Sequence, residues 1–238
     1  MKTHHGVLVA PLFSLLMAAL MAACGNPSSQ GPASSLTPGK LDYSGIHRIY
    51  DRPQVRGGHP LTVFVGAQYC PYCASMRWPL VEALNHFGTL RGLERVSSKQ
   101  GYEGFESIAT YDFSHTSYRS EYITFSSAEI ADVSGNPLQS LDDDQTDLVN
   151  HLDPGGAIPF VFVAGSYTAV LPFSPQLLVG HSFKEIADEI TASSPGNIGR
   201  VINAEADALT AAICKTDGSR PASVCGQPAM QALIQRMP

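Results

Sequence analysis

The sequence lacks a basic patch, and this absence bears on the kind of partner the protein binds. Its 238 residues carry a formal charge of −6, and no cluster of Lys and Arg is visible. Because nucleic acid is bound through such a patch, the composition argues against a nucleic-acid partner. With 44% hydrophobic residues, the chain is that of a globular protein long enough for one sizeable domain.

The sequence also lacks a calcium-binding loop. Its one charge run is Asp142–Asp144, and the Gly and Glu spacing of a calcium loop is absent after it. Acidic residues suit the start of a helix, where partial positive charge collects. We therefore expect a short helix over Leu141–Leu152.

No apolar run in the sequence is long enough to predict a membrane span with confidence. The stretch Val7–Leu20, which follows Lys2, is instead typical of a targeting segment. It runs into Leu20–Cys24, which resembles a bacterial lipobox. The resemblance implies that residues 1–24 are a signal peptide and that Cys24 is lipidated, anchoring the protein outside the cytoplasm. Ordinary signal cleavage is the alternative, although an A-x-A site is not evident here.

Residues 25–40 lack the apolar residues of a core and are rich in Gly, Pro, Ser and Gln. This composition is typical of a flexible linker. We expect the folded domain to occupy residues 41–238.

The feature that carries chemistry is the motif Cys70-Pro71-Tyr72-Cys73. It stands between an apolar strand pattern, Leu61–Ala67, and a helical pattern that continues to Phe87. A cysteine at a helix start has its thiolate stabilised by unpaired N–H groups, and its pKa falls from about 8.5 to roughly 3.5–7.5. Pro71 fits the first turn. We expect an exposed, reactive Cys70 and a shielded Cys73 one turn on that attacks a mixed disulfide.

Two further cysteines, Cys214 and Cys225, flank a turn-rich loop. An exported chain permits disulfides, and local pairing is the simplest of three connectivities. We expect a structural disulfide that contributes about 2–3 kcal/mol. A second redox centre is the alternative.

The rest of the pattern predicts an α/β fold. Leu93–Ser97 is expected to be a second strand, parallel to the first through the crossover helix. An insertion over residues 101–150 follows. The elements after it are a hairpin whose first strand begins at a proline (Pro159–Val163 and Tyr167–Val170), a helix that begins with the capping box Ser182-x-x-Glu185, and a final helix (Ile198–Ile213).

This order, β-α-β, insertion, β-β-α, resembles the thioredoxin fold, here with an extra C-terminal helix and a disulfide-stapled loop. The Cys-x-x-Cys follows the first strand, and Ile158-Pro159 stands at the start of the third strand, which is the first strand of the hairpin. The resemblance implies a cis Ile158–Pro159 bond with Pro159 against the cysteine pair. One departure is Phe64, which stands where better-known relatives usually carry a buried acid.

Several motifs narrow the resemblance to an uncharacterised prokaryotic family, a domain of unknown function with a thioredoxin-like core. They are Asp112-Phe113, Tyr118-x-Ser120-x-Tyr122-Ile123-x-Phe125, Gly156–Phe160, and Ile213-Cys214 through Val224-Cys225. The likeness extends over residues 45–232. The segment Asp112–Phe125 is a candidate substrate or partner surface.

The motif predicts an extracytoplasmic thiol–disulfide oxidoreductase that needs no cofactor. Cys70 forms a mixed disulfide with the substrate, either by attacking or by being attacked, and Cys73 resolves that mixed disulfide. The expected reactants are protein thiols or disulfides and an unidentified redox partner. The expected substrate groove consists of Tyr69, Pro71, Tyr72, Ile158 and Pro159.

Two alternatives stay open. The cysteines also suit Cu(I) or Zn(II), for which His151 is a candidate extra ligand. The second alternative is a binding lipoprotein in which the Cys70–Cys73 disulfide is inert and Tyr69, Tyr72 and Trp78 form a contact surface. For Trp78 we favour core packing. Arg77 is interpreted as an exposed helix residue, the alternative being a source of positive potential near the thiolates.

Overall fold

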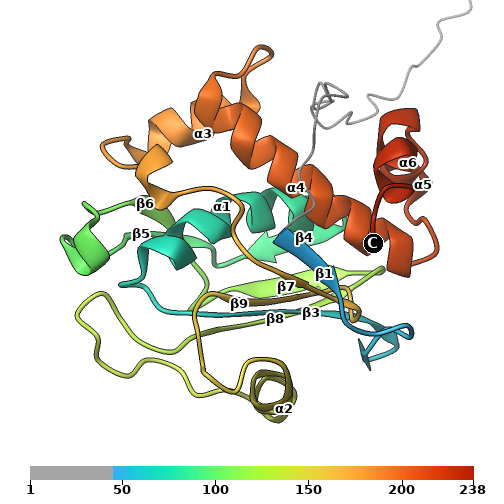
Figure 1. The fold of residues 1–238 in the computed structure, drawn as a ribbon, viewed down its shortest axis with the longest axis horizontal. Coiled ribbons are helices and arrows are strands. Elements are labelled where there is room, and N and C mark those ends of the chain that lie inside the picture. Colours follow the sequence, from blue (N-terminus) through green and yellow to red (C-terminus); the bar gives the residue numbers. More distant parts are fainter. Residues whose placement is uncertain (1–44) are drawn as a thin grey trace, which may run out of the picture. The chain divides into compact units, whose positions relative to one another are not determined.

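The structure is a computed structural model that describes residues 45–238 (Figure 1). The expected signal peptide, the lipidation site Cys24 and the linker 25–40 lie outside the described residues. Within the described range, no helix combines the length and the apolarity that crossing a membrane requires.

A mixed α/β arrangement surrounds a sheet whose central strand is β3. In spatial order, the strands are β1 (Ile46–Arg48), β10 (Tyr167–Ala169), β9 (Phe160–Val163), β3 (His59–Gly66) and β8 (Thr124–Glu129), with β2 (Val55–Arg56) paired to the start of β3. β8 runs parallel to β3, whereas the other pairs are antiparallel. β9 and β10 form the expected hairpin.

Helices cover both faces of this sheet (Figure 1). α1 (Pro71–Asn85), α3 (Phe183–Thr191) and α4 (Asn197–Thr216) lie on one side, and α2 (Asp143–Leu152) lies on the other. α5 (Ala222–Cys225) and α6 (Pro228–Ile234) follow α4, and two short turns are η2 (Tyr102–Gly104) and η3 (Pro175–Leu177). α1 continues through Pro79, and it ends at Asn85, two residues before the end of the helical pattern at Phe87.

Burial on both faces explains the continuous apolar run of β3. Leu61, Val63 and Val65 pack with Leu148 of α2, whereas Phe64 points into the core shared with α1 and α4. Successive strand residues face opposite sides, so a strand covered on both sides shows no polar alternation. Each such side chain contributes about 1.5–3 kcal/mol by its burial.

The insertion lies between α1 and β8, over residues 86–123 rather than the expected 101–150, and it contains two small antiparallel sheets of its own. β4 (Gly88–Arg91) pairs with β7 (Ser117–Ser120), and β5 (Glu94–Ser97) pairs with β6 (Ala109–Asp112). The expectation that Leu93–Ser97 pairs parallel with the first strand is therefore wrong. β5 has no fully buried residue, and a central parallel strand is covered on both faces. The parallel neighbour of β3 is β8 instead.

Trp78 joins α1 to the insertion and to α3. It is fully buried, its indole Nε1–H donates to the carbonyl oxygen of Ala109 at 3.0 Å, and its ring packs against Tyr111 and Phe183. This agrees with core packing and leaves Trp78 no part in an exposed contact surface.

Several locally encoded features match their predictions. Asp142 and Gln145 form a capping box at the start of α2, and Ser182 and Glu185 form the predicted one at α3. Cys214 and Cys225 form a disulfide with their Cα atoms 5.5 Å apart. This bond joins the last turns of α4 to α5.

Candidate functional site

The motif cysteines lie where β3 ends and α1 begins. Cys70 is the N-cap residue of α1, and Pro71 occupies the first turn. The Cys70 sulfur accepts a hydrogen bond from the backbone N–H of Cys73, with 3.2 Å between the two atoms. The sulfur thus takes the place of a capping oxygen at a helix N-terminus, where negative charge is favoured.

Both cysteines are buried free thiols. Cys70 is 3% exposed and Cys73 is fully buried. The shielded position of Cys73 agrees with the sequence, but the expected exposure of Cys70 is wrong. A helix start is often open to solvent, whereas here other parts of the chain close over it.

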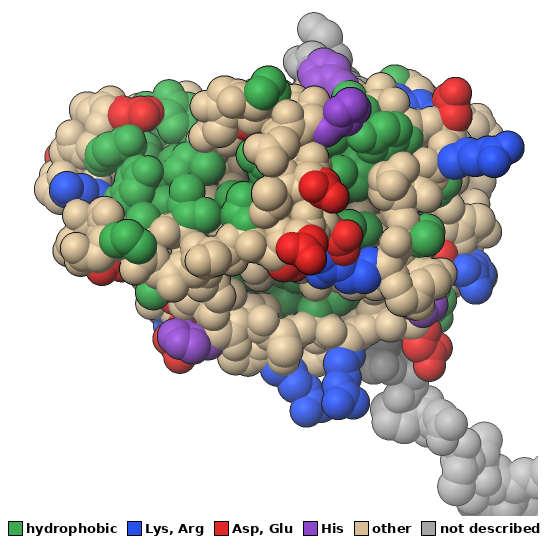
Figure 2. All heavy atoms as spheres, turned by 90° about the horizontal axis from the view of Figure 1, so that it is seen from below, with side chains coloured by type: hydrophobic (Ala, Val, Ile, Leu, Met, Phe, Trp, Pro, Cys, Tyr) green, Lys and Arg blue, Asp and Glu red, His purple; other side chains and the backbone are tan. Residues whose placement is uncertain are grey.

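Part of this closure comes from the insertion. The backbone N–H of Lys99 donates to the carbonyl oxygen of Tyr69 at 3.0 Å. The Tyr69 ring packs at a tilt against the Tyr102 ring, with 4.8 Å between the ring centroids, and the Tyr72 ring meets Phe105 edge-on at 5.7 Å. Aromatic side chains from two segments therefore flank the motif. Figure 2 shows hydrophobic side chains gathered at the left of the molecule, the side on which α1 begins in Figure 1.

The loop before β9 also reaches the cysteines. The Ile158–Pro159 peptide bond is cis, and the Cys70 thiol lies 3.9 Å from the carbonyl oxygen of Ile158. This contact brings Ile158 to Cys70, whose neighbours in the chain, Tyr69 and Pro71, were expected to form a groove with it. Contact of Pro159 itself with a sulfur stays a prediction.

The two thiols have opposite pKa shifts. The pKa of Cys70 is lowered, chiefly by its hydrogen bond with the Cys73 side chain and further by the N–H groups of Cys73 and Tyr72 and the charge of Arg77, against the effect of burial. The pKa of Cys73 is raised well above its usual value, first by burial and then by Cys70. The pair therefore consists of one thiol that ionises readily and one that does not.

Arg77 is not the exposed helix residue that the sequence suggested. Its side chain is fully buried and forms a bidentate ion pair with Glu129 of β8, Nε to Oε1 at 2.8 Å and Nη2 to Oε2 at 2.6 Å. The acid that compensates it comes from the end of the parallel strand, which was not recognised.

Phe64, which stands where the resemblance implies an acid, packs beside Cys73. The Arg77 guanidinium lies over its ring, 5.4 Å from the centroid. A Cβ atom built on Gly66 would lie 2.6 Å from the Phe64 ring and 3.2 Å from the Cys73 sulfur. The space around Cys73 is thus filled, and a side chain at Gly66 would require the Phe64 ring to move.

Sequence reasoning missed Glu129 because β8 gave no strong strand signal. Its residues Thr124–Glu129 include two serines, and only pairing with β3 makes them a strand. Gly66 and Glu129 are register partners. Had β8 been recognised, a lone acid at the same edge of the sheet as the cysteines would have stood out.

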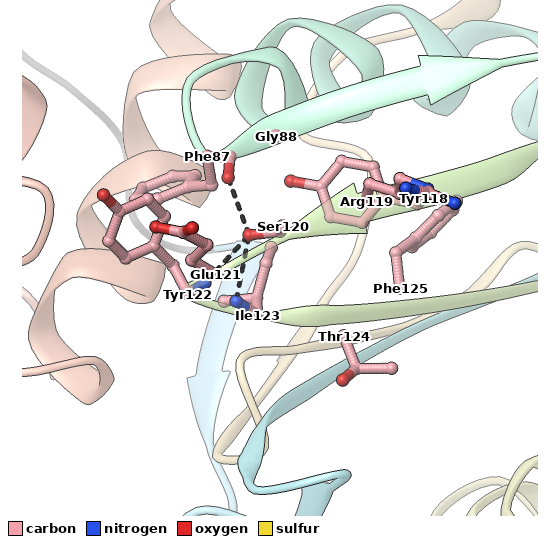
Figure 3. Close-up of a pocket in the computed structure, with 10 residues that line it drawn as sticks. All are labelled: Phe87, Gly88, Tyr118, Arg119, Ser120, Glu121, Tyr122, Ile123, Thr124 and Phe125. Atoms are coloured by element: carbon pink, nitrogen blue, oxygen red, sulfur yellow. Dashed lines mark hydrogen bonds between the residues drawn. The ribbon is translucent and has the colours of Figure 1, made fainter.

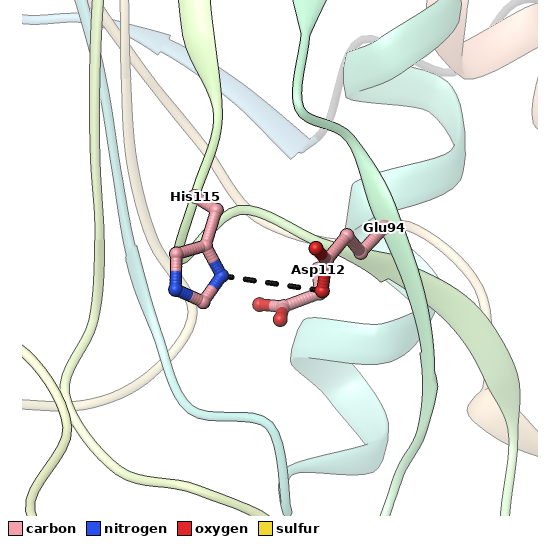
Figure 4. Close-up of side chains that lie close together, drawn as sticks. All are labelled: Glu94, Asp112 and His115. Carbon is pink, nitrogen blue, oxygen red and sulfur yellow. Dashed lines mark ion pairs between the residues drawn. The ribbon is translucent and has the colours of Figure 1, made fainter.

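A separate group of potential metal ligands lies in the insertion. Figure 4 shows Glu94, Asp112 and His115 side by side, and their ligand atoms lie within 4.8 Å of one another. Asp112 is already held by hydrogen bonds from Gln68 and Ser114. His151, the candidate ligand named from the sequence, is not in this group. Within residues 45–238, no His, Asp or Glu joins the two cysteines in a cluster of three.

A pocket of about 680 Å³ lies away from the expected groove. It is lined by Phe87, Gly88 and residues 118–125 (Figure 3), which belong to the candidate partner segment Asp112–Phe125. The Ser120 hydroxyl donates to the Phe87 carbonyl at 2.6 Å and accepts from the N–H groups of Tyr122 and Ile123. Its hydrogen-bonding capacity is used within the protein, and the role of the segment stays a prediction.

The Cys-x-x-Cys and the insertion both fall within a stretch that matches a known family model. Residues 48–154 match DUF929, a domain of unknown function. This DUF929 match includes Arg77 and Glu129, and it ends before Pro159 and the disulfide, so it is shorter than the likeness inferred from the sequence. No curated protein and no solved structure matches the chain.

Proposed function

We propose that this protein is an extracytoplasmic thiol–disulfide oxidoreductase that acts on protein substrates through Cys70 and Cys73. The observation that carries the proposal is the geometry of Cys70. Its sulfur caps α1 and accepts the Cys73 N–H, and the two cysteines are the free thiols of the described chain. Cys70 is then the thiol that forms mixed disulfides, and Cys73 is the one that resolves them.

The order of the strands supports a thioredoxin-like fold as part of this proposal. β10, β9, β3 and β8 are neighbours in that order, and the chain passes from β3 to its parallel partner β8 through α1 and the insertion. A β-α-β unit followed by a hairpin and a helix is the arrangement that the sequence resemblance implies. The cis proline at the start of β9 stands where that resemblance expects one.

The substrate class follows from the surroundings of Cys70. The side chains of Tyr69 and Tyr72 and the carbonyl of Ile158 offer an aromatic surface and a backbone acceptor beside the sulfur. A protein thiol or disulfide in an extended segment fits such a site better than a small charged molecule. Lipidation at Cys24 and a separate redox partner remain parts of the proposal.

Turnover with a disulfide substrate tests the proposal. Reduction of a fluorogenic peptide disulfide by a dithiol should be accelerated by the wild-type protein, and Cys70→Ser should lower the rate at least 100-fold. Cys73→Ser should accumulate a mixed disulfide at Cys70, because the resolving thiol is missing. The double variant Cys214→Ala/Cys225→Ala is the matched control and should keep its activity. Equal rates with wild type, Cys70→Ser and no protein would rule the proposal out.

A further inference from the structure

Beside the cysteines lies a charged pair whose burial needs an explanation. The Arg77 and Glu129 side chains are both fully buried. Removing two charges from water is costly, and replacing a buried ion pair by well-packed apolar residues often leaves stability unchanged or raises it. A pair retained in such a place can be there for its electric field rather than for the stability of the fold.

The position of Arg77 directs that field at the sulfurs. Arg77 follows Cys73 by four residues and Cys70 by seven, so all three lie on one face of α1. Its Nη2 donates to the carbonyl oxygen of Ala67 at 3.0 Å. The same oxygen accepts the backbone N–H of Cys70 at 3.2 Å. One carbonyl group thus separates the guanidinium from the backbone of the N-cap cysteine.

The ion pair does not use all of the donors of Arg77. Its Nη1 is buried and has no hydrogen-bond partner among residues 45–238. A buried donor without an acceptor is unfavourable, so the hydrogen bonds of the ion pair do not fully compensate the guanidinium. Its positive charge therefore acts on the groups around it, and it favours the thiolate form of Cys70 over the thiol form.

The effect on the redox equilibrium has a definite sign. A positive charge near a thiol favours the thiolate, and Arg77 acts in this direction on both Cys70 and Cys73. Only the reduced protein contains a thiolate, since a disulfide carries no charge. Stabilising the thiolate therefore stabilises the reduced form and makes the disulfide a stronger oxidant.

We propose that the buried Arg77–Glu129 pair sets the redox direction of the site, so that the protein donates its Cys70–Cys73 disulfide to reduced dithiols in other proteins. Arg77 acts here as a positioning residue through its charge, and Glu129 limits its effect. This inference rests on the proposed function and adds the direction of electron flow.

The transfer balances as two exchange steps. A substrate thiolate attacks the Cys70 sulfur, the bond between Cys70 and Cys73 breaks, and Cys73 leaves as a thiolate and takes up a proton. A second substrate thiolate then attacks the substrate sulfur of the mixed disulfide, and Cys70 leaves as a thiolate. The substrate dithiol loses two electrons and the cysteine pair gains them. A low pKa makes Cys70 a good leaving group. Reoxidation requires a disulfide-bearing partner.

Two variants that differ only at Arg77 isolate its charge. Glu129→Gln leaves the guanidinium without its counter-charge and keeps an acceptor for the N–H of Phe113, which now donates to Glu129 at 3.4 Å. Arg77→Met/Glu129→Gln removes both charges. Relative to wild type, we expect the first variant to lower the Cys70 pKa and the second to raise it. Arg77→Lys keeps the charge and should stay near wild type.

The readouts are the rate of Cys70 alkylation as a function of pH and the equilibrium of each variant with glutathione. We expect the equilibrium constants of the two variants to differ at least tenfold, which is about 30 mV for a two-electron couple, with Glu129→Gln the stronger oxidant. The oxidised Glu129→Gln protein should also transfer its disulfide further to a synthetic dithiol peptide than the double variant does.

A purely structural role predicts a different result. Both variants, folded by circular dichroism, would then share one Cys70 pKa or shift it in the same direction, and the inference would be overturned. If the double variant does not fold, Glu129→Gln still tests the expected fall of the Cys70 pKa against wild type, and an unchanged or raised pKa in that variant would overturn the inference. Arg77→Lys is then the control that keeps the charge and should leave the Cys70 pKa near that of the wild type. Alkylation needs no substrate, so a wild-type protein without turnover would refute the proposed function while the electrostatic inference is judged by itself.

Discussion

At the scale of single residues, the two cysteines differ in what surrounds their sulfurs. Cys70 faces the N–H groups of α1, whereas Cys73 is fully buried and its pKa is raised chiefly by that burial. We predict that substoichiometric iodoacetamide at neutral pH modifies Cys70 in preference to Cys73 in the reduced protein. The pH at which the Cys70 rate is half-maximal should lie below that of an ordinary cysteine thiol, because the hydrogen bond with the Cys73 side chain lowers the pKa of Cys70.

Peptide mapping across a pH series measures both quantities. The low exposure of Cys70 should make its limiting rate slower than that of a free thiol with the same pKa. Preferential labelling of Cys73, or a midpoint at pH 9 or above, would contradict the assignment of the two roles.

Gly66 is a second residue whose effect is local and specific. An added methyl group would lie 2.6 Å from the Phe64 ring, and inserting atoms into a filled core costs about 1–3 kcal/mol. We predict that Gly66→Ala destabilises the protein by this amount in urea unfolding. Gly155→Ala is the matched control, since its nearest neighbour is a side-chain oxygen of Asp153 at 3.7 Å, and it should be neutral. Equal stabilities of the two variants would refute the packing argument.

At the scale of elements, local signals and tertiary contacts account for different parts of the fold. The apolar run of β3, the capping box of α3 and the β9–β10 hairpin depend on neighbouring residues, and the sequence was sufficient to place them. β8 becomes a strand only through its pairing with β3. Local sequence patterns therefore predict Leu93–Ser97, and not β8, as the parallel neighbour of the first strand. The same holds for the residues of the site. The Cys-x-x-Cys motif identifies Cys70 and Cys73 from the sequence alone, whereas Glu129 is recognised as their neighbour only once the pairing of β8 with β3 is known.

The cap of α2 gives a prediction at this scale. Asp142 accepts the N–H of Gln145 at 2.9 Å, and its carboxylate also binds Arg56 and Ser126. Loss of an N-cap typically costs about 1 kcal/mol. We expect Asp142→Ala to destabilise by at least this amount and Asp143→Ala, one residue into the helix, by much less. Thermal unfolding of both variants checks the difference, and a reversed order would contradict it.

At the scale of the whole molecule, the disulfide ties the C-terminal helices to the body of the protein. Cys214 ends the buried part of α4, and Cys225 belongs to α5. A bond across so short a loop stabilises by about 2–3 kcal/mol, mainly by restricting the unfolded chain. We predict that Cys214→Ala/Cys225→Ala loses that much stability in urea unfolding. A loss of redox activity in the folded variant would instead make this disulfide part of the site.

The dependence of stability on pH has one identifiable source in α4. Burial raises the pKa of Asp207 from 3.8 to about 7. Between these values the folded protein holds a proton that the unfolded chain has released, so stability falls as pH rises from about 4 to 7 and then levels off. The pKa difference sets an upper limit of about 4 kcal/mol. We predict a flatter profile for Asp207→Asn, and an unchanged slope in urea unfolding across this range would refute it.

The central claim is that Cys70 and Cys73 form a reversible redox pair. Equilibrating the protein in glutathione buffers of graded ratio and mapping its disulfides by mass spectrometry tests the claim most directly. The account predicts one two-electron transition between the Cys70–Cys73 dithiol and its disulfide, with Cys214–Cys225 oxidised across that transition. Absence of a Cys70–Cys73 link at every ratio, or only glutathione adducts on the two thiols, would contradict it.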